Sequence, residues 1–251
     1  MAELGGGVVL RIEDIDQTRC RPEYDAAILE DLEWLGFEWP EPVRRQSEHF
    51  VEYETALQTL IDRGLCYRCF KTRKDILEEI GRAPHDAPTA YVSEPLPSSD
   101  EKRLIEQGLP FAWRLNLREA KAALGSTWRE LSFTETTPDG PHQLPVDPAM
   151  HGDVVLARKD SPTSYHLAAT HDDALQGITH IVRGNDLATS THVHVLIQAL
   201  MGWHTPIYSH HSLLTGPDGK RFAKRDKSQT LAALREAGFA PEDVLAKARL
   251  A

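Results

Sequence analysis

Three side chains with complementary chemistry lie within residues 163–191. Tyr165 carries a phenol, Asp173 ends an acidic pair, and Arg183 follows the β-rich run 178–182. An arginine fork can donate two charge-assisted hydrogen bonds to one carboxylate, and a phenol suits an ammonium group or a carboxylate edge. Because ligands of open α/β sheets bind beyond the carboxyl ends of the strands, these groups could converge on a small molecule.

A strand, a turn and a second strand are the elements expected to position these side chains. An apolar segment leads to the acidic pair, and the run that delivers Arg183 is predicted to be the second strand. The same residues also fit a structural interpretation, in which Arg183 pairs with Asp186 and Tyr165 fills a core. On spacing alone, the structural interpretation has at least equal weight.

A basic cluster near the C-terminus is a second chemical signal. Residues 220–227 contain five cations and directly follow the turn Gly216-Pro217-Asp218-Gly219. A basic loop can stabilise the charge that develops on a transferred phosphate. On its own, such a cluster is more often a solvated basic face.

Four segments, in chain order, resemble motifs of the class I glutamyl-tRNA synthetase family. They are residues 10–16 (its Arg-Ile-Glu-Asp segment), 164–168 with Asp172-Asp173 (its amino-acid pocket), 181–184 (its arginine strand) and 221–225 (its Lys-Leu-Ser-Lys-Arg loop). The resemblance covers nearly the whole chain. It implies an α/β fold, a Rossmann-like parallel-sheet catalytic domain of a class I aminoacyl-tRNA synthetase with an inserted α+β subdomain.

The predicted domain organisation has three parts. Residues 1–65 form the first part of the Rossmann-like catalytic domain, and residues 66–150 form an inserted subdomain of the kind that contacts the tRNA acceptor region in the family. Residues 151–251 form the second part of the catalytic domain, with the basic loop and a C-terminal helix. Local patterns predict helices at 22–36, 47–64, 72–80, 100–107, 191–202 and from about 230 onward, and strands at 8–12, 111–115, 128–134 and 152–158, the last returning to the main sheet.

The resemblance also implies roles for residues at the amino-acid site. Glu13 would orient the ammonium group of a glutamate substrate, and Tyr165 and Arg183 would hold the glutamate. An alternative for Glu13 is a structural ion network, whose members would be Arg11, Glu13, Asp14, Asp16 and Arg19.

The basic loop would serve ATP, again by resemblance. Lys224 would stabilise the phosphates as the catalytic residue, with Arg221 and Arg225 beside it in the ATP site. Magnesium is expected with ATP, because it neutralises polyphosphate and keeps most of its waters. Zinc is not expected: Cys66 and Cys69 are two thiolates, whereas a structural zinc site takes four ligands.

The implied reaction is ATP-dependent activation of glutamate followed by its transfer to tRNA. Only residues 226–251 follow the motif at 221–225, so the chain best matches a shortened branch that attaches glutamate to the queuosine base at the wobble position of tRNA(Asp). One alternative is a glutamate-tRNA ligase that charges the tRNA 3′ end. Two others are a catalytically silent glutamate- and nucleotide-binding relative and an unrelated nucleotidyltransferase, which would not explain Tyr165 and Arg183 together.

The start of the chain lacks a counterpart of the family's first strand, its Pro-Ser-Pro-Thr-Gly loop and its His-x-Gly-His helix start. Residues 1–4 resemble the last turn of a helix, and the glycines at 5–7 resemble its stop. We therefore expect the first strand and helix to be missing from this chain and to be encoded upstream of Met1. The missing paired-histidine motif is the feature that favours the silent relative.

Composition limits the class of protein and its partners. With 251 residues and 41% hydrophobic content, the chain can bury a substantial core. It has no apolar run of roughly 18 residues, so we expect no membrane span or secretory signal and a cytoplasmic protein. Its net charge of −10 opposes indiscriminate nucleic-acid binding, so a tRNA partner would need a local basic patch such as residues 220–227.

Overall fold

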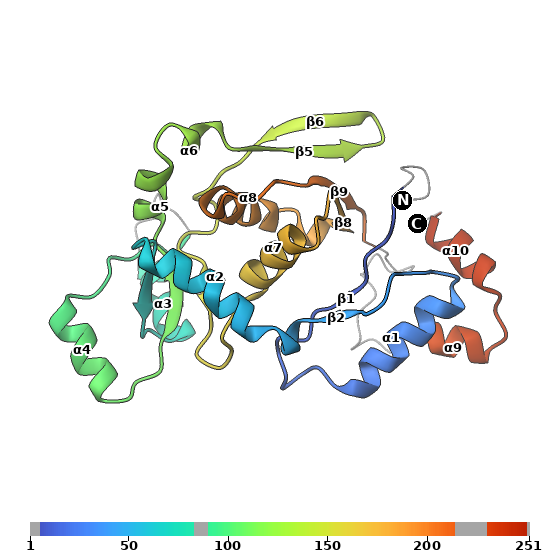
Figure 1. The fold of residues 1–251 in the computed structure, drawn as a ribbon, viewed down its shortest axis with the longest axis horizontal. Coiled ribbons are helices and arrows are strands. Elements are labelled where there is room, and N and C mark those ends of the chain that lie inside the picture. Colours follow the sequence, from blue (N-terminus) through green and yellow to red (C-terminus); the bar gives the residue numbers. More distant parts are fainter. Residues whose placement is uncertain (1–5, 83–89, 214–229, 250–251) are drawn as a thin grey trace. The chain divides into compact units, whose positions relative to one another are not determined.

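The computed structural model describes residues 6–82, 90–213 and 230–249. It divides into two compact units, Met1–Glu48 with Ser212–Ala251 and, as the second unit, His49–His211. Each unit is described by itself (Figure 1). The predicted ATP-site residues Lys224, Arg221 and Arg225 lie outside the described residues, as does the predicted helix end at residues 1–4.

The first unit contains a short parallel strand pair and three α-helices among its described residues. Strand β1 (Arg11–Ile12) pairs with β2 (Arg44–Arg45) and is shorter than the predicted strand 8–12. Helix α1 (Pro22–Trp34) begins at a proline, as predicted, because a proline at the first helical position loses no intrahelical hydrogen bond. A 3₁₀ turn, η2 (Gln46–Glu48), follows β2.

The C-terminal part of this unit corrects one sequence prediction. We expected a single helix from about residue 230, but the chain forms α9 (Leu231–Glu236) and α10 (Pro241–Arg249). Gly238 adopts a φ of 81° between them, and proline opens the second helix. Arg235 of α9 fixes this hairpin to α1 through ion pairs with Glu30 (3.0 Å) and Asp31 (3.2 Å).

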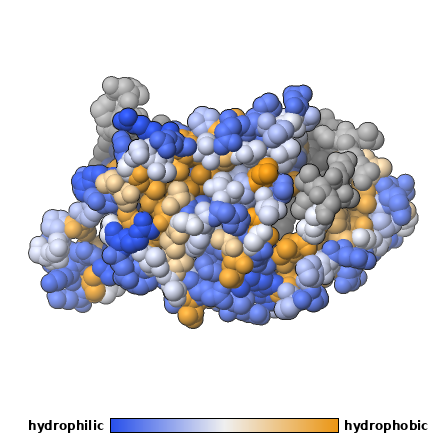
Figure 2. Space-filling model, turned by 45° about the horizontal axis from the view of Figure 1, so that its top comes forward, coloured by the Kyte–Doolittle hydropathy of each residue, from blue (hydrophilic) through white to orange (hydrophobic). Residues whose placement is uncertain are grey.

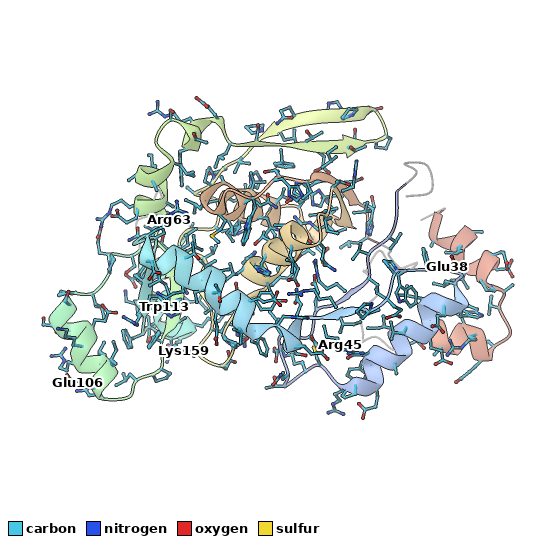
Figure 3. The ribbon with its side chains drawn as sticks, in the orientation of Figure 1. Glu38, Arg45, Arg63, Glu106, Trp113 and Lys159 are labelled. Atoms are coloured by element: carbon cyan, nitrogen blue, oxygen red, sulfur yellow. The ribbon has the colours of Figure 1, made fainter. Side chains whose placement is uncertain are left out.

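The second unit contains an antiparallel sheet of order β3-β4-β7. Its strands are β3 (Cys66–Cys69), β4 (Ala112–Leu115) and β7 (Val155–Ala157). Segment 152–158 was predicted to return to the main parallel sheet, and this prediction is wrong because β7 pairs antiparallel with β4. Trp113 of β4 supports the guanidinium of Arg68, whose carbon lies 4.4 Å from the ring centroid (Figure 3).

Five helices belong to the same part of the unit: α2 (Phe50–Asp62), α3 (Arg73–Arg82), α4 (Ser98–Glu106), α5 (Leu117–Leu124) and α6 (Thr127–Glu130). Asn116 caps α5 by accepting hydrogen bonds from the backbone N–H groups of Arg118 and Glu119. Just before β7, Gly152 has a φ of 65°, and a Cβ atom there would overlap the backbone carbonyl of Tyr91. The close approach therefore requires glycine.

A four-stranded sheet of order β6-β5-β9-β8 forms the rest of the second unit. Its strands are β5 (Ser132–Thr137), β6 (Gly140–Pro145), β8 (His180–Gly184) and β9 (Ile207–His211). Strands β8 and β9 run parallel over five residue pairs, and β5 joins β9 in parallel at the pair Glu135 and Tyr208. Strands β5 and β6 form an antiparallel hairpin that extends from this sheet (Figure 1).

Two helices accompany this sheet, α7 (Tyr165–Leu175) and α8 (Ser190–Met201), with the 3₁₀ turn η3 (Asn185–Leu187) between β8 and α8. The segment that begins at Tyr165 was predicted to be a strand, and this prediction is wrong. Its alanine residues favour a helix. Helix α7 buries four consecutive residues, Leu167 to Thr170, and a short run of buried residues looks the same in sequence whether it forms a helix or a strand.

The main apolar cluster of the second unit contains residues of α2, α5, α7 and α8 and of strands β4 and β7. Leu60, Leu115, Leu156, Leu167 and Ile197 are completely buried in it. Gly202 follows α8 in the left-handed conformation, which ends the helix. Arg63, which follows α2, donates to the carbonyl of Leu200 near the end of α8, where a cation complements the helix dipole (Figure 3).

A buried polar contact connects α2 with α7. The hydroxyl of Tyr53 donates to a carboxylate oxygen of Asp172 at 2.8 Å, and both residues are completely buried.

Figure 2 shows hydrophilic residues interspersed with smaller apolar areas on one face of the surface. No helix of the described residues combines the length and the apolar character that a bilayer crossing requires.

Candidate amino-acid site

Arg183 and His210 are register partners on the parallel strands β8 and β9. Neighbouring residues of paired strands project from the same face of a sheet, so their side chains meet. Arg183 Nε donates to His210 Nε2 at 3.1 Å. Tyr208, two residues earlier on β9, projects from this face as well, and its ring centroid lies 5.2 Å from the guanidinium carbon. The strand register therefore fixes the base of the site.

Helices α7 and α8 supply the remaining contacts of the guanidinium. Arg183 Nη2 donates to Thr191 Oγ1 at 2.6 Å, and Nη1 donates to His194 Nδ1 at 3.2 Å. Thr191 and His194 stand three residues apart and so share one face of α8. The hydroxyl of Tyr165, the first residue of α7, lies 3.4 Å from Nη1, which is a long hydrogen bond. The structure thus brings the predicted residues Tyr165 and Arg183 together.

The contacts of Arg183 leave one N–H group of its guanidinium for a ligand. A guanidinium presents a side edge, made by Nε and Nη2, and an outer edge, made by Nη1 and Nη2. His210 and Thr191 occupy the side edge. On the outer edge, Nη1 contacts His194 at 3.2 Å and Tyr165 at the longer 3.4 Å, whereas Nη2 keeps one N–H group without a hydrogen bond among the described residues. A carboxylate that approached this edge would accept from Nη2 and replace the long contact of Nη1 with Tyr165.

The partners of Arg183 are uncharged groups or an imidazole. Among the residues that the structure describes, no carboxylate forms an ion pair with Arg183, and Asp186 is not one of its contacts. The structural alternative of an Arg183–Asp186 pair is therefore not formed. A guanidinium held without a carboxylate partner retains its attraction for an incoming carboxylate.

Two histidines extend the hydrogen bonds of Arg183 without adding charge. Because a guanidinium only donates, His194 Nδ1 must accept, and its Nε2–H then donates to His166 Nδ1 at 3.2 Å. Burial, the largest cause, together with the nearby His151 and Arg183 lowers the pKa of His166 to about 4. A neutral His166 follows at neutral pH, so the guanidinium is the cation of this group.

Glu135 of β5 contacts His210 from the side opposite Arg183. Both of its carboxylate oxygens lie 2.9 Å from His210 Nδ1, and one accepts the backbone N–H of His210 at 3.1 Å. Sequence reasoning did not identify Glu135, which lies 75 positions before His210. Only the pairing of β5 with β9 brings this glutamate to the site.

The acidic pair on α7 divides between two environments. Asp172 accepts from Tyr53 and contacts His171 Nδ1 at 3.1 Å, so it belongs to the packing of α2 against α7. Asp173 lies near the base of the site, where its negative charge interacts with Tyr208. Burial raises the pKa of Tyr208 to about 12; a hydrogen bond from Gln198 and the charge of Arg183 oppose the rise, whereas Asp173 and Tyr165 add to it.

Glu13 lies in the first unit, and its relation to Arg183 remains a prediction. Within its own unit it pairs with Arg11, whose Nη2 lies 2.9 Å from Glu13 Oε1. Asp14 accepts two hydrogen bonds from Ser47, at 2.8 Å to the backbone N–H and 2.6 Å to the hydroxyl. Part of the expected charge network is therefore present, although Asp14 serves to hold the backbone rather than a cation.

The cysteine pair does not form one metal site in this structure. Cys66 packs against the main apolar cluster, whereas Cys69 belongs to a separate cluster with Tyr67, Ile76 and Tyr91, because residues three apart on β3 face opposite sides. Burial raises the pKa of Cys66 to about 12, which opposes the thiolate that a metal requires. The described residues include no group of three or more histidine, cysteine, aspartate or glutamate side chains suited to a metal ion.

Comparison with known proteins identifies the family. The model described as "tRNA synthetases class I (E and Q), catalytic domain" matches residues 2–251. The glutamyl-Q tRNA(Asp) synthetase of Rhodobacter capsulatus is 43% identical over 248 residues, which cover 96% of this chain and 87% of that protein. The enzyme of the same name from Symbiobacterium thermophilum is 36% identical, covering 96% of this chain and 75% of that protein.

Full-length ligases are also similar, over part of their length. The glutamate–tRNA ligase of Coprothermobacter proteolyticus is 31% identical, and the match covers 96% of this chain but 50% of that protein. A crystal structure of a glutamate tRNA ligase from Elizabethkingia meningosepticum in complex with its amino acid has a TM-score of 0.71 and 27% identity, covering 96% of this chain and 53% of that one. The chain thus spans about half the length of these ligases.

Proposed function

The chain belongs to the class I tRNA synthetase (E and Q) catalytic-domain family, and on this basis we propose that it activates glutamate with ATP and transfers it to the queuosine base of tRNA(Asp). A carboxylate oxygen of glutamate attacks the α-phosphorus of ATP, and pyrophosphate leaves. A hydroxyl of the queuosine base then attacks the acyl carbon of the mixed anhydride, and AMP leaves. No covalent enzyme intermediate is needed.

The observation that carries this proposal is the guanidinium of Arg183, which has no carboxylate partner among the described residues and one N–H group of Nη2 without a hydrogen bond. A part-buried fork of this kind suits a substrate that carries a carboxylate, and Tyr165 stands beside it. Glu13 would receive the ammonium group of glutamate. Lys224, with Arg221 and Arg225, would stabilise the phosphates of ATP, which would bind as its magnesium complex.

The choice of acceptor rests on the relatives. Those named glutamyl-Q tRNA(Asp) synthetase match along 87% and 75% of their own length, whereas the glutamate–tRNA ligase matches along 50%. The second candidate is therefore charging of the tRNA 3′ end, favoured by the likeness to solved ligase structures. We place either reaction in the cytoplasm, where the tRNA substrate occurs.

A transfer assay with radiolabelled glutamate distinguishes these candidates. We expect label on tRNA(Asp) that carries queuosine and none on the same tRNA with guanine at the wobble position. The label should remain after removal of the 3′-terminal adenosine. Label that depends on this adenosine would instead establish 3′-end charging. Glutamate binding without pyrophosphate exchange or transfer would establish the silent relative.

A further inference from the structure

Glu135 lies on the β5–β6 hairpin, yet its carboxylate is separated from Arg183 by a single imidazole ring. His210 Nδ1 contacts both carboxylate oxygens at 2.9 Å, and its Nε2 accepts from Arg183 at 3.1 Å. The side chains of His210 and Glu135 are 5% and 11% exposed, so water competes little for these bonds. The three groups form a continuous carboxylate, imidazole and guanidinium series within one unit.

Only one tautomer of His210 satisfies both neighbours. The guanidinium of Arg183 can only donate and an ionised Glu135 can only accept, so His210 must carry its proton on Nδ1 and its lone pair on Nε2. The opposite tautomer would place an N–H group against Arg183 and a lone pair against the carboxylate. Glu135 therefore determines which nitrogen faces Arg183.

We propose that Glu135 and His210 are positioning residues for glutamate binding. Glu135 fixes the tautomer and ring orientation of His210, and His210 together with Thr191 holds the side edge of Arg183. The outer edge is then presented to the substrate carboxylate in one orientation. This inference rests on the proposed function, since the ligand of the fork is glutamate.

The arrangement also explains how a negative charge can lie near Arg183 without competing with the substrate. Glu135 compensates part of the positive charge of Arg183 through the imidazole, but it does not touch the guanidinium. A direct ion pair would occupy the donors that the substrate carboxylate needs. A structural alternative exists, because β5 joins β9 at one register pair and the contact of Glu135 with His210 also anchors the hairpin.

Isothermal titration with L-glutamate on the full chain separates these roles. Glu135→Ala and His210→Ala should each raise the glutamate Kd about tenfold, which is the low end of the loss seen when a residue that orients a metal ligand is removed. Glu135→Gln should change it by less than about threefold, because the amide oxygen still accepts from Nδ1–H. Asp139→Ala is the matched control: it removes a carboxylate from the exposed turn of the same hairpin and should leave the Kd unchanged.

A double substitution provides the decisive comparison. If Glu135 acts only through His210, adding Glu135→Ala to His210→Ala should not weaken glutamate binding further, whereas independent roles would add. Unfolding midpoints measured on the same variants report the anchoring role. A lowered midpoint for Glu135→Ala with an unchanged glutamate Kd, or additive losses in the double variant, would overturn the inference.

The tautomer of His210 can be read without any ligand. Long-range ¹H–¹⁵N NMR spectra should show Nδ1–H in the unsubstituted chain and in Glu135→Gln, and a tautomer mixture in Glu135→Ala. A mixture in the unsubstituted chain would overturn the positioning role. A single Nδ1–H tautomer in a chain that binds no glutamate would refute the proposed function, and with it glutamate as the ligand, while the assigned arrangement of Arg183 stands.

Discussion

Replacing Arg183 by alanine tests the site most directly. The substitution removes the fork that would hold the substrate carboxylate, and breaking a hydrogen-bonded charge pair costs about 2–5 kcal/mol. At about 1.4 kcal/mol per tenfold, this range corresponds to a rise in the glutamate Kd of roughly 30-fold to 4,000-fold. The side edge of Arg183 is occupied by protein groups and only its outer edge would meet the ligand, so we expect a value near 30-fold to 100-fold.

The assay is equilibrium binding of L-glutamate and of ATP to the same variant. ATP affinity should stay within about twofold, because ATP is assigned to Lys224, Arg221 and Arg225, whereas Arg183 is assigned to the glutamate carboxylate. Arg183→Lys keeps the charge but loses the planar fork, and we expect it to weaken glutamate binding by about tenfold or more. Arg103→Ala, which removes a 63% exposed arginine from α4, is the matched control and should change neither affinity.

Stability has to be measured beside affinity for Arg183→Ala. The guanidinium lies over the ring of Tyr208, and losing this contact should lower the free energy of unfolding by about 0.5–2 kcal/mol. The variant should therefore remain folded at room temperature. Equal losses of glutamate and ATP affinity in a folded variant, or normal glutamate affinity, would refute the assignment of Arg183 to the carboxylate.

Three further predictions concern the scaffold. Tyr53→Phe removes the hydroxyl that buried Asp172 accepts from, so urea unfolding should show a loss of about 1.5–3 kcal/mol; an unchanged midpoint would contradict this. Gly152→Ala should lower the free energy of unfolding by clearly more than Gly177→Ala. Both glycines have positive φ (65° and 62°), but only a Cβ atom at 152 would overlap the backbone of Tyr91. Equal losses of about 1–2 kcal/mol in the two variants would refute the steric argument. His166, with its pKa lowered from 6.5 to about 4, binds a proton more readily when unfolded, so stability falls as pH drops from about 6.5 towards 4; the loss by pH 5 should be about 2 kcal/mol and should vanish in His166→Gln.

Sequence patterns predicted those elements in which the apolar periodicity agrees with the residues that start and end a helix, such as proline and glycine. Helix α1 begins at Pro22, α8 ends before Gly202, and α3 and α4 occupy the predicted segments. The strand predicted at Tyr165 was wrong, because a short apolar run has no period that distinguishes a buried helix from a buried strand. The final helix was predicted as one element although Gly238 interrupts it.

The site was only partly predictable for a different reason. Tyr165 and Arg183 were predicted as site residues because their chemistry suits a ligand; their binding role stays a prediction, and the structure brings Arg183 Nη1 within 3.4 Å of the Tyr165 hydroxyl. Thr191, His194 and Glu135 were missed, because their roles arise from the pairing of strands and the facing of helices. Residues 75 positions apart, such as Glu135 and His210, meet only through the register of β5, β9 and β8.

The contacts of the arginines themselves separate a binding group from a structural one. Arg45 and Arg235 each form an ion pair with a carboxylate of their own unit, so their charge is already compensated. Arg183 instead donates to hydroxyl and imidazole groups. The carboxylate of Glu135 contacts the far nitrogen of the His210 ring and does not contact Arg183 itself. A protein that needed Arg183 only for packing would gain more from a direct carboxylate partner, since leaving a part-buried charge without one costs free energy. That cost is recovered when a substrate carboxylate binds, and the same reasoning requires that carboxylates bind to this fork more tightly than the isosteric amides, with glutamate favoured over glutamine.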